Sequence, residues 1–170
     1  MSSRAAFVAS QQIAPALINA AINGGIAWAM HRDTAALALW GDGGYATDLL
    51  ATGLLLPGIT WLIVHPLWRR QARQGKAPAL AGVPVPWLTR WLPSTYWRGA
   101  LVVGLFGTAI GAGVAGLMQA IGSPTFAGAQ YAWFKGAYGG LLPILLQPAM
   151  LFAVLHNTGS GGAARSALGE

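Results

Sequence analysis

Long apolar stretches without ionisable side chains dominate this chain, and short charged segments separate them. A helix rises about 1.5 Å per residue, so about 20 apolar residues cross a hydrocarbon core roughly 30 Å thick. Four stretches fit that length, at about 13–30, 46–65, 99–121 and 131–155. The pattern predicts an all-α integral membrane protein. We expect a bundle of four transmembrane helices within residues 1–156 and a flexible tail at 157–170.

The segment 67–98, between the second and third stretches, has a different composition. Four prolines fall between residues 78 and 93, which is too dense for a spanning helix. Tryptophans accompany them, and tryptophan is favoured at the depth of the lipid headgroups. We therefore expect an interfacial cytoplasmic loop in which Trp87, Arg90 and Trp91 contact headgroups.

Charge is divided unequally along the chain. Residues 67–98 hold six basic residues and no acid, whereas three of the four acids lie between residues 30 and 49. A loop rich in Lys and Arg marks the cytoplasmic side of a membrane protein. The division predicts a multi-pass protein of the cell membrane with both termini cytoplasmic. Arg69, Arg70 and Arg73 are expected to contact anionic headgroups.

The net charge of +6 does not indicate nucleic-acid binding, because the basic residues flank predicted spans, where lipid supplies the counter-charge. Only 8% of the residues are charged, too few to cover a soluble domain of this size. The expected partners are a bilayer with anionic headgroups and other membrane helices or further copies of the chain.

An internal repeat is suggested by two alignments. A shift of 88 residues aligns 21–30 with 109–118, and five of the ten positions match. A shift of 91 aligns Pro57 and His65 with Pro148 and His156. Two related helical hairpins pointing the same way through the membrane would produce this pattern. Chance similarity between helices rich in Ala, Leu and Gly is the alternative.

Four amide side chains lie within the predicted spans. Asn19 and Asn23 are four residues apart on one helical face, and Gln119 and Gln147 lie in the third and fourth spans. Amides in hydrocarbon require hydrogen-bond partners, so we expect all four in the polar interior of the bundle. They either join helices or line a polar path. The ammonium of Lys135 is expected to snorkel to the outer membrane surface.

Glycines at a spacing of four indicate close helix packing. Gly107 and Gly111 form such a pair in the third span, and Gly136 and Gly140 form another in the fourth. The absence of a side chain allows two helix backbones to approach.

The histidines provide the one cofactor hypothesis. Imidazoles of His65 and His156 on two helices can hold a haem b or another metal. Both lie at the cytoplasmic boundary and no further ligand accompanies them, so we expect no cofactor. The chain has no cysteine, which excludes disulfides and thiolate sites.

The remaining function classes are few. Away from their ends, the predicted spans lack the ionisable residues that ion-driven transport uses, and no catalytic motif is evident. We expect a small permease-like or pore-like unit, or an accessory subunit of a membrane complex, rather than an enzyme. The sequence does not separate these two. A haem-binding electron-transfer protein using His65 and His156 is the alternative.

Overall fold

The computed structural model describes residues 3–75, 86–93 and 95–167, with side chains for 12–75, 86–93 and 95–155. Four long helices form the fold, and all four are apolar and long enough to span a membrane. The all-α four-helix membrane fold predicted from the sequence is confirmed. In chain order the elements are α1 (Ser3–His31), α2 (Tyr45–Arg73), the short 3-10 helix η1 (Trp87–Trp91), α3 (Tyr96–Ala120) and α4 (Gly128–Ala167).

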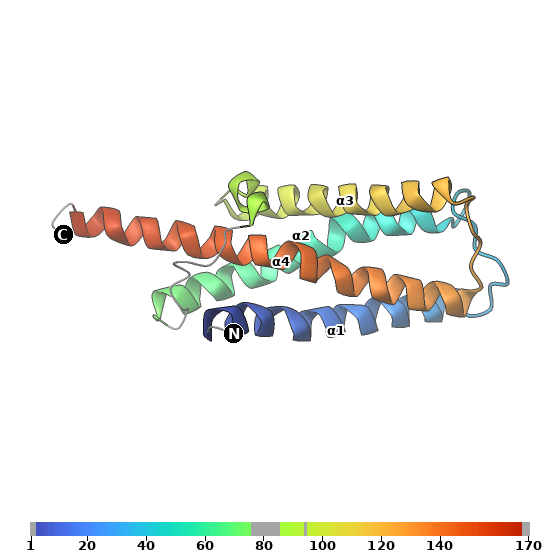
Figure 1. Ribbon diagram of the computed structural model, residues 1–170, viewed down its shortest axis with the longest axis horizontal. Coiled ribbons are helices and arrows are strands. Elements are labelled where there is room, and N and C mark those ends of the chain that lie inside the picture. The colour runs from blue at the N-terminus through green and yellow to red at the C-terminus, as the bar shows by residue number, and fades with distance from the viewer. Residues whose placement is uncertain (1–2, 76–85, 94, 168–170) are drawn as a thin grey trace.

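The helices pack as a row in the order α1, α4, α2, α3 (Figure 1). α1 packs mainly on α4, α2 packs mainly on α3, and α2 and α4 contact each other in the middle. In the most apolar part of each helix, 72% of the α4 residues are buried, against 11% of the α1 residues. α4 is therefore the central helix, and most of α1 faces outward.

The connectors 32–44 and 121–127 lie together at one end of the bundle, which we call the loop end (Figure 1). Leu37 and Phe126 exchange two backbone hydrogen bonds there, of 2.7 and 3.1 Å. The Tyr45 hydroxyl donates to the carbonyl oxygen of Pro124 at 2.9 Å, and its ring lies edge-on to Phe126. These contacts fix the two connectors to each other.

The opposite end, which we call the basic end, carries η1 and the last turns of α2. α2 continues through Pro66 to Arg73, although the sequence placed residues 67–98 in a loop. Proline lacks an N–H and frees the carbonyl four residues earlier. Here that carbonyl, of Leu62, accepts a hydrogen bond of 2.8 Å from the Tyr96 hydroxyl. The helix therefore passes the proline without an unpaired acceptor at that point.

The backbone of α4 is helical to Ala167, so the helix enters the segment for which the sequence predicted a flexible tail. Three of the residues 163–167 are alanine, the strongest helix former, which explains helix in a segment otherwise rich in Gly and Ser. Figure 1 shows α4 extending well beyond the other helices at the basic end.

The glycines chosen from their spacing lie at helix contacts. A Cβ at Gly107 would lie 2.0 Å from the carbonyl oxygen of Gly53, so α2 and α3 approach here almost backbone to backbone. A Cβ at Gly136 would lie 3.1 Å from the carbonyl oxygen of Ala20. A Cβ at Gly140 would lie 3.1 Å from the Cβ of Ala20. α1 thus packs on a smooth strip of α4.

The pairing of the helices bears on the internal repeat without testing the sequence match itself. Exchanging α1 with α3 and α2 with α4 leaves the row unchanged, as a two-fold pseudo-axis through the contact of α2 and α4 would require. However, α1 packs on α4 rather than on α2, so consecutive helices of the first half do not form a packed hairpin in the described structure. The repeat stays a prediction.

Candidate functional site

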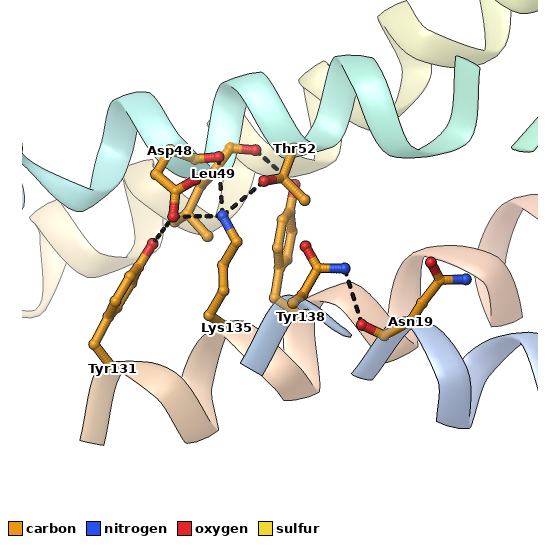
Figure 2. A network of polar contacts seen from close by, with 8 residues as sticks. Asn19, Asp48, Leu49, Thr52, Tyr131, Lys135 and Tyr138 are labelled. Carbon is orange, nitrogen blue, oxygen red and sulfur yellow. Dashed lines mark hydrogen bonds and ion pairs between the residues drawn. The ribbon is translucent and has the colours of Figure 1, made fainter. Parts of the chain in front are cut away.

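A charged cluster lies on the seam between α2 and α4, near the loop end (Figure 2). Asp48, in the first turn of α2, forms an ion pair with Lys135 of α4. The ammonium of Lys135 also donates to Thr52 Oγ1 at 2.6 Å and to the backbone carbonyl oxygen of Asp48 at 3.1 Å. Its three donors thus have three acceptors, all on α2.

The two charges differ in their exposure. The side chain of Lys135 is 4% exposed and that of Asp48 is 44% exposed. The expectation that Lys135 snorkels to the membrane surface is therefore wrong, because its ammonium points across the seam to α2 instead. The positive N-terminal end of the α2 dipole also favours a carboxylate in this first turn.

Two tyrosines of α4 complete the cluster. The Tyr131 hydroxyl donates to the same carboxylate oxygen of Asp48 that contacts Lys135. The Tyr138 hydroxyl donates to the backbone carbonyl oxygen of Leu49 at 3.0 Å. This hydroxyl occupies the space that glycine leaves at position 111 of α3, where a Cβ would lie 2.8 Å away. The cluster therefore extends to the junction of three helices.

Sequence reasoning missed this site because it counted Asp48 only among the three acids between residues 30 and 49 and placed Lys135 at a membrane surface. A signal was present, since Asp48 is the third residue of the predicted span 46–65 and Lys135 the fifth of 131–155. Both spans enter the membrane from the same side, so the two charges lie at similar depth.

The predicted polar interior is only partly as expected. The amides of Asn19 and Asn23 donate to the backbone carbonyls of Pro15 and Asn19, at 2.8 and 2.9 Å. Both bonds lie within α1, so these amides do not join helices, although Asn23 packs against Gly139 of α4. A side chain that bonds its own helix needs no partner helix.

The two glutamines differ. Gln147 is buried, and no described residue donates a hydrogen bond to its Oε1. Gln119 is exposed near the end of α3, where its Oε1 accepts a hydrogen bond of 2.6 Å from Trp40. The placement of Gln119 in the bundle interior was therefore wrong, because the helix ends at Ala120 and the connector 32–44 supplies its partner.

A basic pocket of about 570 Å³ lies at the opposite end of α2. The residues that line it are His65, Pro66, Arg69, Arg70, Arg73, Gln74 and Tyr96. The three arginines are exposed. In the part of the chain that the structure describes, they form no ion pair, and the acids Asp33, Asp42 and Asp48 are all at the loop end.

η1 lies beside this end of the bundle. Leu88 is buried, whereas Trp87, Arg90 and Trp91 are exposed. Thr89 donates a hydrogen bond of 3.4 Å to the carbonyl oxygen of Ala149 and so attaches η1 to α4. The exposed set contains the residues for which the sequence predicts contact with headgroups.

His65 is buried and lies between two aromatic rings. The centroid of its ring is 5.0 Å from that of Trp61 and 5.5 Å from that of Tyr96. The side chain of His156 lies outside the described residues. Within those that are described, no group of three or more His, Cys, Asp or Glu is placed to hold a metal. His65 packs as an aromatic side chain, and the haem alternative has no support.

A groove of about 720 Å³ runs between α1 and α4. Eight of its ten lining residues are Gly or Ala, and the other two are Trp28 and Trp133. The side chain of Trp133 is 83% exposed. The groove is therefore an apolar surface in which Trp28 and Trp133, one from each helix, are the only large side chains among the described lining residues. It lies on an outward face of the spans, which the bilayer would cover.

These features define an α-helical membrane protein with an ion pair inside its spans, a basic pocket at one end and an apolar groove on one face. Comparisons of the chain with protein-family models, with curated proteins and with solved structures each gave no match.

Proposed function

We propose that the protein is a subunit of a multi-pass membrane assembly, and that two copies join through the groove between α1 and α4. The groove carries this proposal. In a bilayer the hydrophobic effect does not drive helices together, and association depends on close packing at small residues. A groove lined almost entirely by Gly and Ala is the surface on which a further helix packs most closely.

A second copy is the favoured occupant because α1 also carries a complementary ridge next to the groove. Ile18, Ile22 and Ile26 are exposed on α1 at a spacing of four. Ile22 and Ile26 follow the groove residues Ala21 and Gly25 by one position, about 100° around the helix. A two-fold axis along the membrane normal, placed between ridge and groove, sets each copy's ridge over the other's groove.

The resulting contact would join two pairs of α1 and α4 into a four-helix core. It would cover α1, whose apolar side chains are otherwise exposed on most of its circumference. Trp28 and Trp133 would then border the dimer interface, where large aromatic side chains contribute strongly to binding.

Cysteine cross-linking in native membranes tests this proposal, because the chain has no cysteine of its own. We expect Ala21→Cys to give a disulfide-linked dimer on mild oxidation. Ala109→Cys is the matched control, being an exposed alanine at similar depth on α3. If both variants cross-link equally, or Ala21→Cys does not, the two-fold dimer is wrong.

A blocking substitution gives an independent test. Gly25 and Gly113 both have open space where a Cβ would be, so a side chain can be added at either position without a clash at its Cβ within one copy. Gly25→Leu should convert the dimer to a monomer in mass measurements made in lipid nanodiscs, whereas Gly113→Leu should leave it dimeric. A dimer that survives Gly25→Leu with unchanged affinity contradicts the proposal.

A second candidate, a permease-like unit, is favoured by the charged cluster. Ionisable residues within a span are functional candidates by default. Asp48 is half exposed, and its contacts with Lys135 and Tyr131 both reach the same one of its two carboxylate oxygens. The other oxygen is available to a cationic or hydrogen-bonding solute that reaches the loop end.

Thermal-shift screening tests this candidate with metal cations, small amines and amino acids. A transport site predicts a solute that raises the melting temperature of the parent and of Asp42→Asn but not of Asp48→Asn. Asp42 is the control because it is an exposed acid in a connector at the same end. If no solute distinguishes Asp48→Asn from the parent, the pair is structural only.

We also propose that the protein lies in the cell membrane with both termini cytoplasmic. Two observations support this orientation. The described chain begins and ends toward the basic end (Figure 1), and Arg69, Arg70 and Arg73 lie there while the described acids lie at the loop end.

A further inference from the structure

The basic pocket holds more positive charge than the acids in the described part of the chain balance. Arg69, Arg70 and Arg73 lie within about one turn of α2 and line one cavity. The nearest acid along the helix is Asp48, and the 21 residues from it to Arg69, at about 1.5 Å each, place it about 32 Å away. Screening at physiological salt acts over about 8 Å, so the described acids do not compensate these charges.

The pocket lies where phosphate is abundant. Trp87, Trp91 and Trp97 are exposed at the same end of the bundle, and exposed tryptophans mark the level of the lipid headgroups. Guanidinium groups suit phosphate because their planar fork donates two parallel hydrogen bonds. Basic pockets between membrane helices on the cytoplasmic side bind anionic headgroups in this manner.

Hydrogen bonds and ring packing hold one wall of the pocket in place. Tyr96 is held by a hydrogen bond to Leu62 and by the indole of Trp61, which donates to its carbonyl oxygen at 2.8 Å. His65 is buried against both rings and forms part of the wall. A packed aromatic wall beside exposed guanidinium groups gives a site with one fixed side.

We propose that this pocket binds a single phosphate group, supplied by the headgroup of an anionic phospholipid or by free phosphate. The two sources differ in what else they carry. A headgroup is covalently attached to acyl chains that enter the bilayer beside α2 and α3, whereas free phosphate arrives from water. The proposal is independent of the dimer, because the pocket shares no lining residue with the groove.

The test uses the full chain, delipidated in a neutral detergent, with binding read from tryptophan fluorescence. The probes are a short-chain phosphatidylglycerol, the matching phosphatidylcholine and inorganic phosphate. A headgroup site predicts saturable binding of phosphatidylglycerol at one per chain, at least ten-fold tighter than phosphatidylcholine and free phosphate. A free-phosphate site predicts that inorganic phosphate binds as tightly and displaces phosphatidylglycerol. If none of the probes binds saturably, the proposal is wrong.

The variants separate this pocket from general surface charge. The triple variant Arg69→Gln, Arg70→Gln, Arg73→Gln should bind about 100-fold more weakly, since each basic residue near a membrane surface contributes about five-fold. The double variant Arg90→Gln, Arg98→Gln is the control, because both arginines are exposed nearby but neither lines the pocket. Equal losses in the two variants overturn the proposal.

The single variant Arg70→Lys keeps the charge and removes the fork, so it tests the pocket if the triple variant does not fold. A phosphate site predicts weaker binding by Arg70→Lys with an unchanged melting temperature. Unchanged binding would mean that only the net charge matters, which contradicts a built site.

Discussion

We expect the two members of the ion pair, Asp48 and Lys135, to lower stability by unequal amounts when each is replaced. Removing the carboxylate by Asp48→Asn leaves a buried ammonium, and removing the ammonium by Lys135→Met leaves a half-exposed carboxylate. Because the Lys135 side chain is 4% exposed and that of Asp48 is 44% exposed, the first change should destabilise the protein more.

The size of each loss in the free energy of unfolding depends on which charged group is left without its partner. Breaking a buried pair costs about 3–5 kcal/mol when the remaining charge is fully buried, and Asp48→Asn should fall within this range. After Lys135→Met the carboxylate keeps its bond from Tyr131 and reaches water, so we expect about 1–2 kcal/mol. The double variant removes both charges and should be more stable than Asp48→Asn alone.

Reversible unfolding in mixed micelles, followed by tryptophan fluorescence, measures these differences. The exposed pair Arg32 and Asp33 provides the control, and Asp33→Asn should change the free energy of unfolding by less than about 0.5 kcal/mol. The reasoning is refuted if Lys135→Met costs more than Asp48→Asn, or if the double variant loses the sum of the two single losses.

Three further predictions concern packing and topology. Gly107→Ala should lower the free energy of unfolding by about 3 kcal/mol or more, because its Cβ would overlap a backbone carbonyl, while Gly113→Ala should be neutral in the same melts. Gln147→Met should leave stability unchanged or raise it, since its buried Oε1 has no donor among the described residues; a loss above about 1 kcal/mol would reveal a donor. Reporter fusions at Gly43 and Gly75 should report opposite sides of the membrane, with Gly75 cytoplasmic; activity on one side for both would contradict the topology.

The four helices were predictable from sequence because hydropathy is a local property. Each span needs only enough consecutive apolar residues, and the hydrocarbon core allows few alternatives to helix. Helix ends were harder to predict. The predicted span ended at residue 65, before Pro66, but Tyr96, 30 residues later, satisfies the freed carbonyl of Leu62 and allows the helix to continue. A compensating contact so distant along the chain is not visible in a local pattern.

The charged cluster was not predicted because it depends on which helices are neighbours. Lys135 is a snorkelling residue if α4 is peripheral and an ion-pair partner if α4 lies beside α2. Small residues in the spans indicated close packing but not its partners. Gly107 contacts α2, whereas the similarly spaced Gly136 contacts α1.

Because the helices pack in a row, each helix is held in the bundle mainly by its neighbours in that row. α1 is joined to the rest through α4, and α4 is joined to the pair of α2 and α3 mainly through α2. The ion pair lies on that middle seam, so its loss weakens the main contact between the two helix pairs. In a dimer joined through α1 and α4, the pair of α1 and α4 would be covered on both sides. The seam would then be the weakest remaining contact, and Asp48→Asn would separate α2 and α3 from an intact dimeric core before that core unfolds.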